Sequence, residues 1–247
     1  MKANTKEEVK GYYSEKEEAQ TYMKNRLSAP VYIVEHEIQA EFINKQIKQN
    51  KAKNILEIGC GPGRLTKEVN MKGLKGTAMD YSKEMLKIAE DIPGWTFTWG
   101  DAFKYQSNKK FDLVFSYRFF FHFKEDDRKR LYKTTKSTLK PSGVLLFEAR
   151  NKVVAGKIKK LVKKFFKTKY KIYQKLYERE ELIQELKDNG FVNIELHDNL
   201  RHFFIQSIIS KFTRFCPKFG VKIIRMIEKI PGEPFSWNVK CAIPSKN

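Results

Sequence analysis

Residues 54–66 read N-I-L-E-I-G-C-G-P-G-R-L-T, and this stretch sets the architecture expected of the whole chain. Apolar residues run up to Gly59, three glycines fall within five positions, and a helical pattern begins at Arg64. This order predicts a buried strand, a tight turn and the start of a helix. Glycine lets a ligand approach the backbone, and free amide groups at a helix start suit an anionic or polar group. The stretch therefore predicts a nucleotide-binding turn.

The spacing of the glycines narrows the class of nucleotide. An NAD site expects G-x-G-x-x-G, but here Gly63 follows Gly59 and Gly61, and Arg64 stands at the expected third position. A P-loop would require G-K-[ST], which is absent. The pattern E-x-G-x-G-x-G, which begins at Glu57, resembles the first signature of class I S-adenosylmethionine (SAM) dependent methyltransferases. The resemblance implies SAM as the cofactor, held by Glu57 and the three glycines.

Two acidic residues follow the next two predicted strands. The second strand ends at Asp80, and an acid in that place can accept hydrogen bonds from both ribose hydroxyls. Its alternative role as a helix cap is already filled by Ser82. The third strand leads to Asp101-Ala102, which matches the G-D-A that meets adenine in the resembling enzymes; a plain turn residue is the alternative. We expect these residues, with Tyr81, to bind the adenosine.

The fourth predicted strand, residues 111–117, should end at the reaction centre, because ligands of open α/β sheets lie beyond the carboxyl ends of strands. Tyr117 there is expected to contact the cofactor or the acceptor. His122 is a candidate general base, with a purely structural histidine as the alternative. The chain has no [DN]-P-P-[YFW] tetrapeptide and no Pro-Cys nucleophile at this place, which argues against methylation of nucleic-acid bases by those routes.

The resemblance implies an α/β, Rossmann-like class I methyltransferase fold. We expect a mostly parallel seven-stranded sheet with an antiparallel edge strand near residues 235–243. N-terminal helices should include one amphipathic helix over 31–48, and the closing part of this region would place Tyr22 and Arg26 at the cofactor, with Arg26 on the methionyl carboxylate. The expected divisions are a helical cap over 1–50, a SAM-binding domain over 51–247, and helical inserts at about 151–177 and 203–230.

The charge of the chain is strongly positive and unevenly distributed. The 247 residues carry a net charge of +20, and residues 151–177 contain ten lysines and no acid. Such a segment favours an anionic partner: membrane headgroups, nucleic acid or a charged substrate. The apolar stripe among these lysines predicts a helix that covers the active site, contacts a membrane, or packs with a solvated basic face.

The remaining composition excludes several classes. No apolar run approaches the roughly 20 residues of a membrane span, and the polar start lacks the apolar core of a signal peptide, so a cytoplasmic protein is expected, with peripheral membrane contact as an open addition. Three widely spaced cysteines argue against a zinc site or a disulfide framework, and we expect no metal.

The leading prediction is therefore a SAM-dependent methyltransferase (EC 2.1.1.-) with a small-molecule or lipid-like acceptor beyond the fourth strand. SAM already carries an activated methyl group, so the protein has mainly to orient the acceptor and exclude water. An RNA-directed methyltransferase or basic RNA-binding module is a second reading, motivated by the charge, and a non-catalytic SAM-binding subunit is a third. Neither the acceptor atom nor the oligomeric state follows from the sequence.

Overall fold

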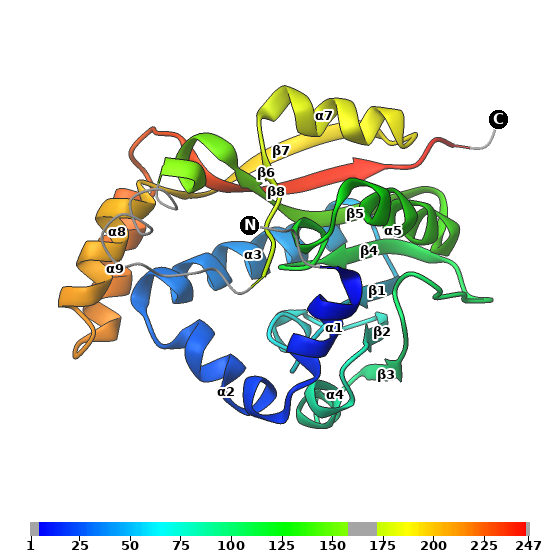
Figure 1. Ribbon diagram of the computed structural model, residues 1–247, viewed down its shortest axis with the longest axis horizontal. Coiled ribbons are helices and arrows are strands. Elements are labelled where there is room, and N and C mark those ends of the chain that lie inside the picture. The colour runs from blue at the N-terminus through cyan, green and yellow to red at the C-terminus, as the bar shows by residue number, and fades with distance from the viewer. Residues whose placement is uncertain (1–4, 158–171, 246–247) are drawn as a thin grey trace.

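The computed structural model describes residues 5–157 and 172–245. Three helices precede the sheet: α1 (Lys6–Ser14), α2 (Lys16–Leu27) and α3 (Pro30–Gln49) (Figure 1). A capping box between Thr5 and Glu8 starts α1, and Pro30 occupies the first turn of α3, where its missing N–H costs no hydrogen bond. The single amphipathic helix expected over 31–48 is thus confirmed.

The strands form one mixed sheet, and the expected fold class is confirmed. The strand order is β3-β2-β1-β4-β5-β8-β7, with the short β6 paired to β5 off this path. All the described pairs are parallel except those that β8 makes with β5 and β7. The bounds are β1 (Asn54–Ile58), β2 (Lys75–Asp80), β3 (Trp95–Trp99), β4 (Phe111–Ser116), β5 (Leu139–Asn151), β6 (Leu176–Tyr177), β7 (Val192–Arg201) and β8 (Pro234–Ala242).

The register of the parallel strands brings their carboxyl ends to one edge. Ile58 of β1 pairs with Met79 of β2, and Asp80 pairs with Trp99 of β3. The residues that follow these strands therefore lie next to one another although they are about 20 residues apart in sequence. This edge is where the sequence places the nucleotide.

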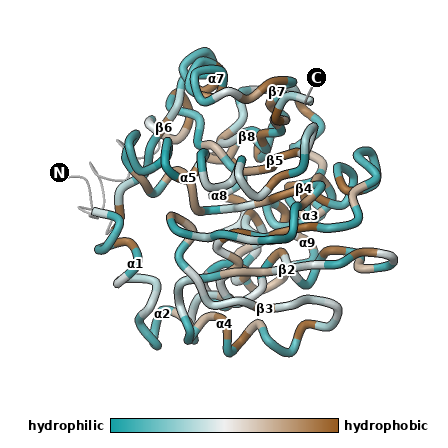
Figure 2. The backbone as a smooth tube through the Cα atoms, turned by 90° about the vertical axis from the view of Figure 1, so that its right-hand side faces the viewer, coloured by the Kyte–Doolittle hydropathy of each residue, from teal (hydrophilic) through white to brown (hydrophobic). Residues whose placement is uncertain are grey.

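Helices cover both faces of the sheet. The face that carries Ile55, Leu113 and Phe115 packs on Ile43 and Ile47 of α3, and the opposite face packs on α5 and α7. Figure 2 shows the strands running through the middle of the molecule, with the hydrophilic outer side of α7 above them. Further helical segments are α4 (Lys83–Ala89), α5 (Glu125–Thr138), α7 (Arg179–Asp188), α8 (Phe203–Phe212), α9 (Pro217–Ile227) and the 3₁₀ turns η1 (Thr66–Glu68) and η2 (Phe120–His122). Residues 152–157 are helical as well.

Two local expectations were wrong. The helix expected from Arg64 is only the 3₁₀ turn η1, because Arg64 turns inward to bond His36 and Gln39 of α3 and Thr66 turns inward to bond Glu57. The strand expected at the sheet edge, β8, lies one place inside it, and β7 forms the edge. β8 is antiparallel as expected.

The sequence predicts two helical inserts, at about residues 151–177 and 203–230. The second consists of α8 and α9, with Pro217 in the first turn of α9, and both pack against α3. Most of the lysine-rich stripe of the first insert, residues 158–171, lies outside the described residues. Nowhere in the described ranges is a helix long and apolar enough to cross a bilayer.

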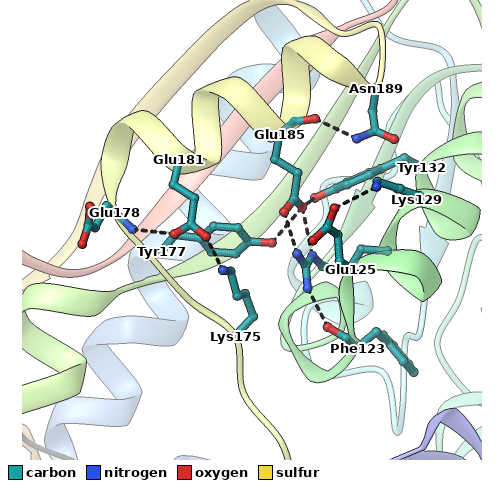
Figure 3. A network of polar contacts seen from close by, with 11 residues as sticks. Phe123, Glu125, Lys129, Tyr132, Lys175, Tyr177, Glu178, Glu181, Glu185 and Asn189 are labelled. Carbon is teal, nitrogen blue, oxygen red and sulfur yellow. Dashed lines mark hydrogen bonds and ion pairs between the residues drawn. The ribbon is translucent and has the colours of Figure 1, made fainter. Parts of the chain in front are cut away.

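A polar network joins α5 to α7 and fixes the turn that follows β4 (Figure 3). Arg128 donates to both carboxylate oxygens of Glu185, at 2.9 and 2.6 Å, and the hydroxyls of Tyr132 and Tyr177 each donate to Glu185 Oε1 at 2.9 Å. The same guanidinium donates to the carbonyl of Phe123 at 2.8 Å. Because Phe123 ends η2, the network holds that turn in place behind the carboxyl end of β4.

Candidate active site

A pocket lies where the parallel strands end. Its walls come from three sources: α1 and α2, the loops after β1, β2 and β3, and the segment after β4. The expected residues Gly59, Gly61, Asp80, Tyr81, Asp101, Ala102, Tyr117, His122 and Tyr22 all line it; Glu57 lines a smaller recess beside it. The fold thus brings nearly all of the predicted site residues into one place.

Two glycines of the turn after β1 have different roles. Gly61 has φ +55, and a Cβ built there would meet no atom within 4 Å, so this side of the turn faces the open pocket. Gly63 has φ +77, and a Cβ there would lie 2.2 Å from Cδ1 of Ile92. Both positions favour glycine because of the left-handed backbone. Gly61 leaves room for a ligand, whereas Gly63 lets the turn pack.

Asp80 is held by backbone amides rather than by a cation. Its Oδ2 accepts from Gly61 N at 2.7 Å and its Oδ1 accepts from Ser82 N at 2.8 Å. Burial raises the pKa of this carboxyl above its usual value. The cap of α4 is Ser82, whose hydroxyl accepts from Met85 N at 3.2 Å. Each oxygen of Asp80 keeps a lone pair that a hydroxyl in the pocket can use.

Asp101 already has a cationic partner. Lys10 Nζ of α1 lies 2.7 Å from Oδ2, and Phe103 N donates to Oδ1 at 3.0 Å. Partial burial acts to raise the pKa of Asp101, but the hydrogen bonds from Lys10 and the Phe103 amide and the nearby lysine charges together keep this pKa below its usual value. The same ammonium sits 4.7 Å from the ring centre of Tyr81 and 5.3 Å from that of Phe103. α1 is therefore anchored directly in the pocket.

The recess beside Gly59 and Gly61 contains Glu57. This carboxyl is 3% exposed and accepts from Thr66 Oγ1 at 2.5 Å. Burial raises the pKa of Glu57 to about 8, so the carboxyl is mostly protonated at neutral pH. Arg64 and Tyr22 border the same recess. This end of the turn can meet a group that carries both an amine and a carboxylate.

His122 uses both of its ring nitrogens. Nδ1 lies 3.0 Å from the carbonyl of Tyr173, which can only accept, so Nδ1 carries the proton and Nε2 accepts from the Tyr13 hydroxyl at 3.3 Å. Burial lowers the pKa of His122 to about 3, so the ring is neutral at pH 7. This arrangement favours a positioning role over that of a strong general base.

The other expected residues lie close by. Tyr22 stands at 6.5 Å from Tyr13, ring centre to ring centre, and the guanidinium of Arg26 lies 5.3 Å from the Tyr22 ring. Arg26 itself does not line the pocket, but its charge acts on His122. Tyr117 is buried, and its hydroxyl has no hydrogen-bond partner among the described residues.

Residues 55–143 match the family described as "Methyltransferase domain". These residues form a methyltransferase domain, and the sheet around them has the class I methyltransferase fold. Its fold is similar to that of DhpI in complex with S-adenosylhomocysteine (SAH), with a TM-score of 0.65 and 17% identity over 97% of each chain. The family match over residues 55–143 covers the glycine turn, both pocket acids and His122, and it ends before the basic inserts.

Two relatives show how much of the chain is similar in sequence to known proteins. The chain is 36% identical over 105 residues to malonyl-[acyl-carrier protein] O-methyltransferase 2 of Ilyobacter polytropus, an alignment that spans 40% of each protein. It is 28% identical over 204 residues to the uncharacterized protein MJ1252 of Methanocaldococcus jannaschii, covering 74% of this chain and 76% of that protein. The chain thus spans less than half of the first relative.

Several residues that line the pocket were not expected from the sequence. Lys10 and Tyr13 come from α1, and Arg118 follows β4 with φ +57, an unusual backbone conformation for a side chain of its size. Arg118 pairs with Glu35 of α3. One available signal was the occurrence of charged residues at core positions of otherwise apolar segments, such as Glu35 in α3 and Glu148 in β5.

Proposed function

We propose that this chain transfers a methyl group from SAM to a small-molecule acceptor held beyond β4. The observation that carries the proposal is the joint placement of Gly61, Asp80 and Asp101 around one pocket at the carboxyl ends of β1, β2 and β3. Gly61 faces open space, so a ligand can contact the backbone closely there. Each acid keeps lone pairs that can accept hydrogen bonds from a ligand in the pocket. These features fit an adenosine with two ribose hydroxyls and an exocyclic amine.

The proposed roles follow from these positions. Asp80, beside Tyr81, accepts from the ribose, and Asp101 with Ala102 meets adenine. The recess at Glu57 holds the methionyl amine and carboxylate, with Gly59 beside it and Tyr22 and Arg26 closing from α2. SAM supplies a methyl group on a positively charged sulfur when bound. The division into a cap over residues 1–50 and a domain over 51–247 is part of this proposal.

The part of the pocket after β4 would hold the acceptor. Tyr117, Phe119 and His122 line it from one side, and Tyr13 of α1 lines it from another. Aromatic walls exclude water and fix the angle of approach, which is the main demand of an in-line methyl transfer. His122 stays a candidate base, although its Nε2 must first release the Tyr13 hydroxyl.

Calorimetry with SAH tests the cofactor assignment. We expect saturable binding to the full chain, with affinity lowered by about 5- to 150-fold in Asp80→Ala and in Asp101→Ala, because each removes a buried hydrogen-bond acceptor worth roughly 1–3 kcal/mol. Asp198→Ala is the matched control, since Asp198 pairs with Arg201 on β7, outside the pocket. Absence of heat with wild-type protein, or full affinity in both pocket variants, contradicts the proposal. Binding without turnover on any acceptor would support the non-catalytic alternative.

A further inference from the structure

A buried cluster of charged side chains lies behind the acceptor side of the pocket. Glu35 of α3 is 1% exposed and forms an ion pair with Arg118. Arg150 of β5 has its Nη2 3.6 Å from Glu35 Oε1 and 3.0 Å from Glu148 Oε1. Arg118 alone of these four lines the pocket. Charges are rarely buried unless something pairs them, so the balance of this cluster is informative.

Positive charge exceeds negative charge in this region. Arg26 and Arg64 also act on Glu35, which brings four guanidinium groups to the neighbourhood of Glu35 and Glu148. Arg26 is half-buried, but the other three guanidinium groups are buried and face only two buried carboxylates. Glu57 does not balance them, because it is mostly protonated at neutral pH. An excess positive charge inside a protein costs free energy unless an anion joins it.

Hydrogen bonding within the cluster is incomplete as well. Arg118 Nε and Arg150 Nε have no hydrogen-bond partner among the described residues, and oxygens of Glu35 and Glu148 also lack one. The Arg118 side chain is only 9% exposed and its backbone lies in the left-handed region. A buried unpaired donor and a strained backbone at the same pocket residue are typical of a ligand-binding position.

We propose that Arg118 binds an anionic group of the methyl acceptor, so that the acceptor is a small oxyanion-bearing molecule such as a carboxylate or a phosphate ester. Arg118 lines the pocket from the segment after β4, as Phe119 and His122 do, whereas the two acids lie at the ends of β2 and β3. Glu35 positions its guanidinium, and Arg150, stacked 4.5 Å over the Phe235 ring, adds charge from behind. The inference rests on the proposed function.

The test measures binding of malonate, with malonamide as its neutral counterpart, to the full chain saturated with SAH. Wild-type protein should bind malonate at least about 10-fold more tightly than malonamide. Arg118→Met should lose about 10-fold or more in malonate affinity, and Arg118→Lys should keep part of it. Arg225→Met is the matched control, because Arg225 pairs with Glu37 and Glu41 on the outside of α3.

A second arm separates the acceptor from the cofactor as the source of the anion. SAH carries a methionyl carboxylate and 5′-methylthioadenosine does not. If Arg118→Met weakens SAH and leaves 5′-methylthioadenosine unchanged, Arg118 binds the cofactor carboxylate and the inference is overturned. Equal binding of malonate and malonamide by the wild-type complex overturns it without any variant. Failure of the wild-type chain to bind SAH would instead remove the proposed function.

A second feature, the outer face of α8 and α9, carries an independent inference. Large apolar side chains are exposed there: Phe212 is 81% exposed, Phe215 94% and Phe219 61%, and Phe204, Ile208 and Met226 are each more than two-fifths exposed. The opposite sides of these helices are anchored, with Phe203 and Ile224 buried against Val31 and Val34 of α3. Several large apolar side chains exposed on one pair of helices are typical of a surface that meets a partner.

The charges around this face indicate the partner. Exposed lysines and an arginine surround the phenylalanines: Lys211, Arg214, Lys218, Lys222 and Lys229. Residues 203–227 contain no aspartate or glutamate. Phenylalanines flanked by basic residues on an amphipathic hairpin match the boundary between acyl chains and anionic headgroups. We infer that the α8–α9 face docks on an anionic membrane surface, which would bring the pocket to lipid-borne or membrane-soluble acceptors.

Vesicle sedimentation tests this docking. The full chain should sediment with phosphatidylcholine vesicles that contain phosphatidylglycerol, less with pure phosphatidylcholine, and less as salt rises. Replacing Phe212 and Phe215 by Ser together should lower partitioning by about 100-fold or more, because the burial of two large apolar side chains in the bilayer is lost. Ile88→Ser, at a 44% exposed position of α4, is the control. No sedimentation of wild-type protein, or concentration-dependent dimers that the double variant abolishes, overturns the inference.

Discussion

The two halves of the pocket are built in different ways. On the adenosine side, backbone amides hold the acids: Gly61 and Ser82 donate to Asp80, and Phe103 donates to Asp101. On the acceptor side, side chains hold one another across long stretches of chain. Arg118 and Glu35 are 83 residues apart, and His122 and Tyr13 are 109 apart. The first half is fixed mainly by backbone amides of the loops after β1, β2 and β3, and Lys10 of α1 adds one ion pair to Asp101. The second half exists only once the N-terminal helices have docked.

The glycine turn gives the largest expected effect and tests the adenosine half. Gly61→Ala and Gly63→Ala both force a side chain into the left-handed region, at roughly 1–2 kcal/mol each. The methyl group at residue 61 would enter the pocket and lower SAH affinity by about 10- to 100-fold through overpacking. The methyl group at residue 63 would press on Ile92 and lower the melting temperature more than the affinity. Calorimetry and thermal unfolding of both variants measure this contrast.

The opposite pattern would break the comparison. If Gly61→Ala binds SAH as tightly as the wild type does, the open side of this turn does not face the nucleotide. The adenosine half would then have to be placed elsewhere along the strand ends.

His122 tests the acceptor half through pH. Its pKa is about 3 in the folded chain against a usual value of 6.5. Between these values the unfolded chain binds more protons, so stability is complete above pH 6.5 and falls as pH drops through this window, by about 2 kcal/mol at pH 5. Urea unfolding at pH 5 and pH 7 should show a smaller difference for His122→Gln than for the wild type.

Part of the pH effect will survive in that variant, because burial and Arg64 also lower the pKa of His36. An unchanged pH difference in His122→Gln would mean that His122 is not buried as a neutral ring. A nuclear magnetic resonance signal assigned to the His122 imidazole that titrates near pH 6.5 would have the same meaning.

Glu57 gives the smallest effect and tests where the two halves meet. Burial raises its pKa to about 8, so it holds a proton at pH 7. The methionyl ammonium of bound SAH would favour the ionised carboxylate, and binding should release up to about one proton. Calorimetry in two buffers with different heats of ionisation measures that proton, and Glu57→Gln should not release it. Heats that do not depend on the buffer would place the ammonium away from Glu57.

The same contrast explains what could be inferred from the sequence. Gly61, Asp80 and Asp101 follow strands directly, so local patterns of apolar residues and glycine sufficed to place them. Arg118 lies one residue beyond the expected Tyr117, yet its role depends on Glu35, and no local pattern links the two.

The two wrong expectations have the same origin. The helix expected from Arg64 is replaced by a 3₁₀ turn because that side chain bonds residues of α3, 25 and 28 positions earlier. The place of β8 inside the sheet depends on which strand covers it, and β7 does so through tertiary pairing. Local propensity contains neither fact.

Because Lys10 of α1 already pairs with Asp101, α1 would compete with the adenine amine for this carboxylate. The Lys10 ammonium and the adenine amine would both bond to the Asp101 carboxylate. The net free energy that this contact contributes to cofactor binding is therefore the difference between the two interactions. In the proposed complex the adenine amine would share Asp101 with Lys10, and the ion pair that holds α1 would weaken. Binding of the methyl donor and docking of α1 are therefore thermodynamically linked.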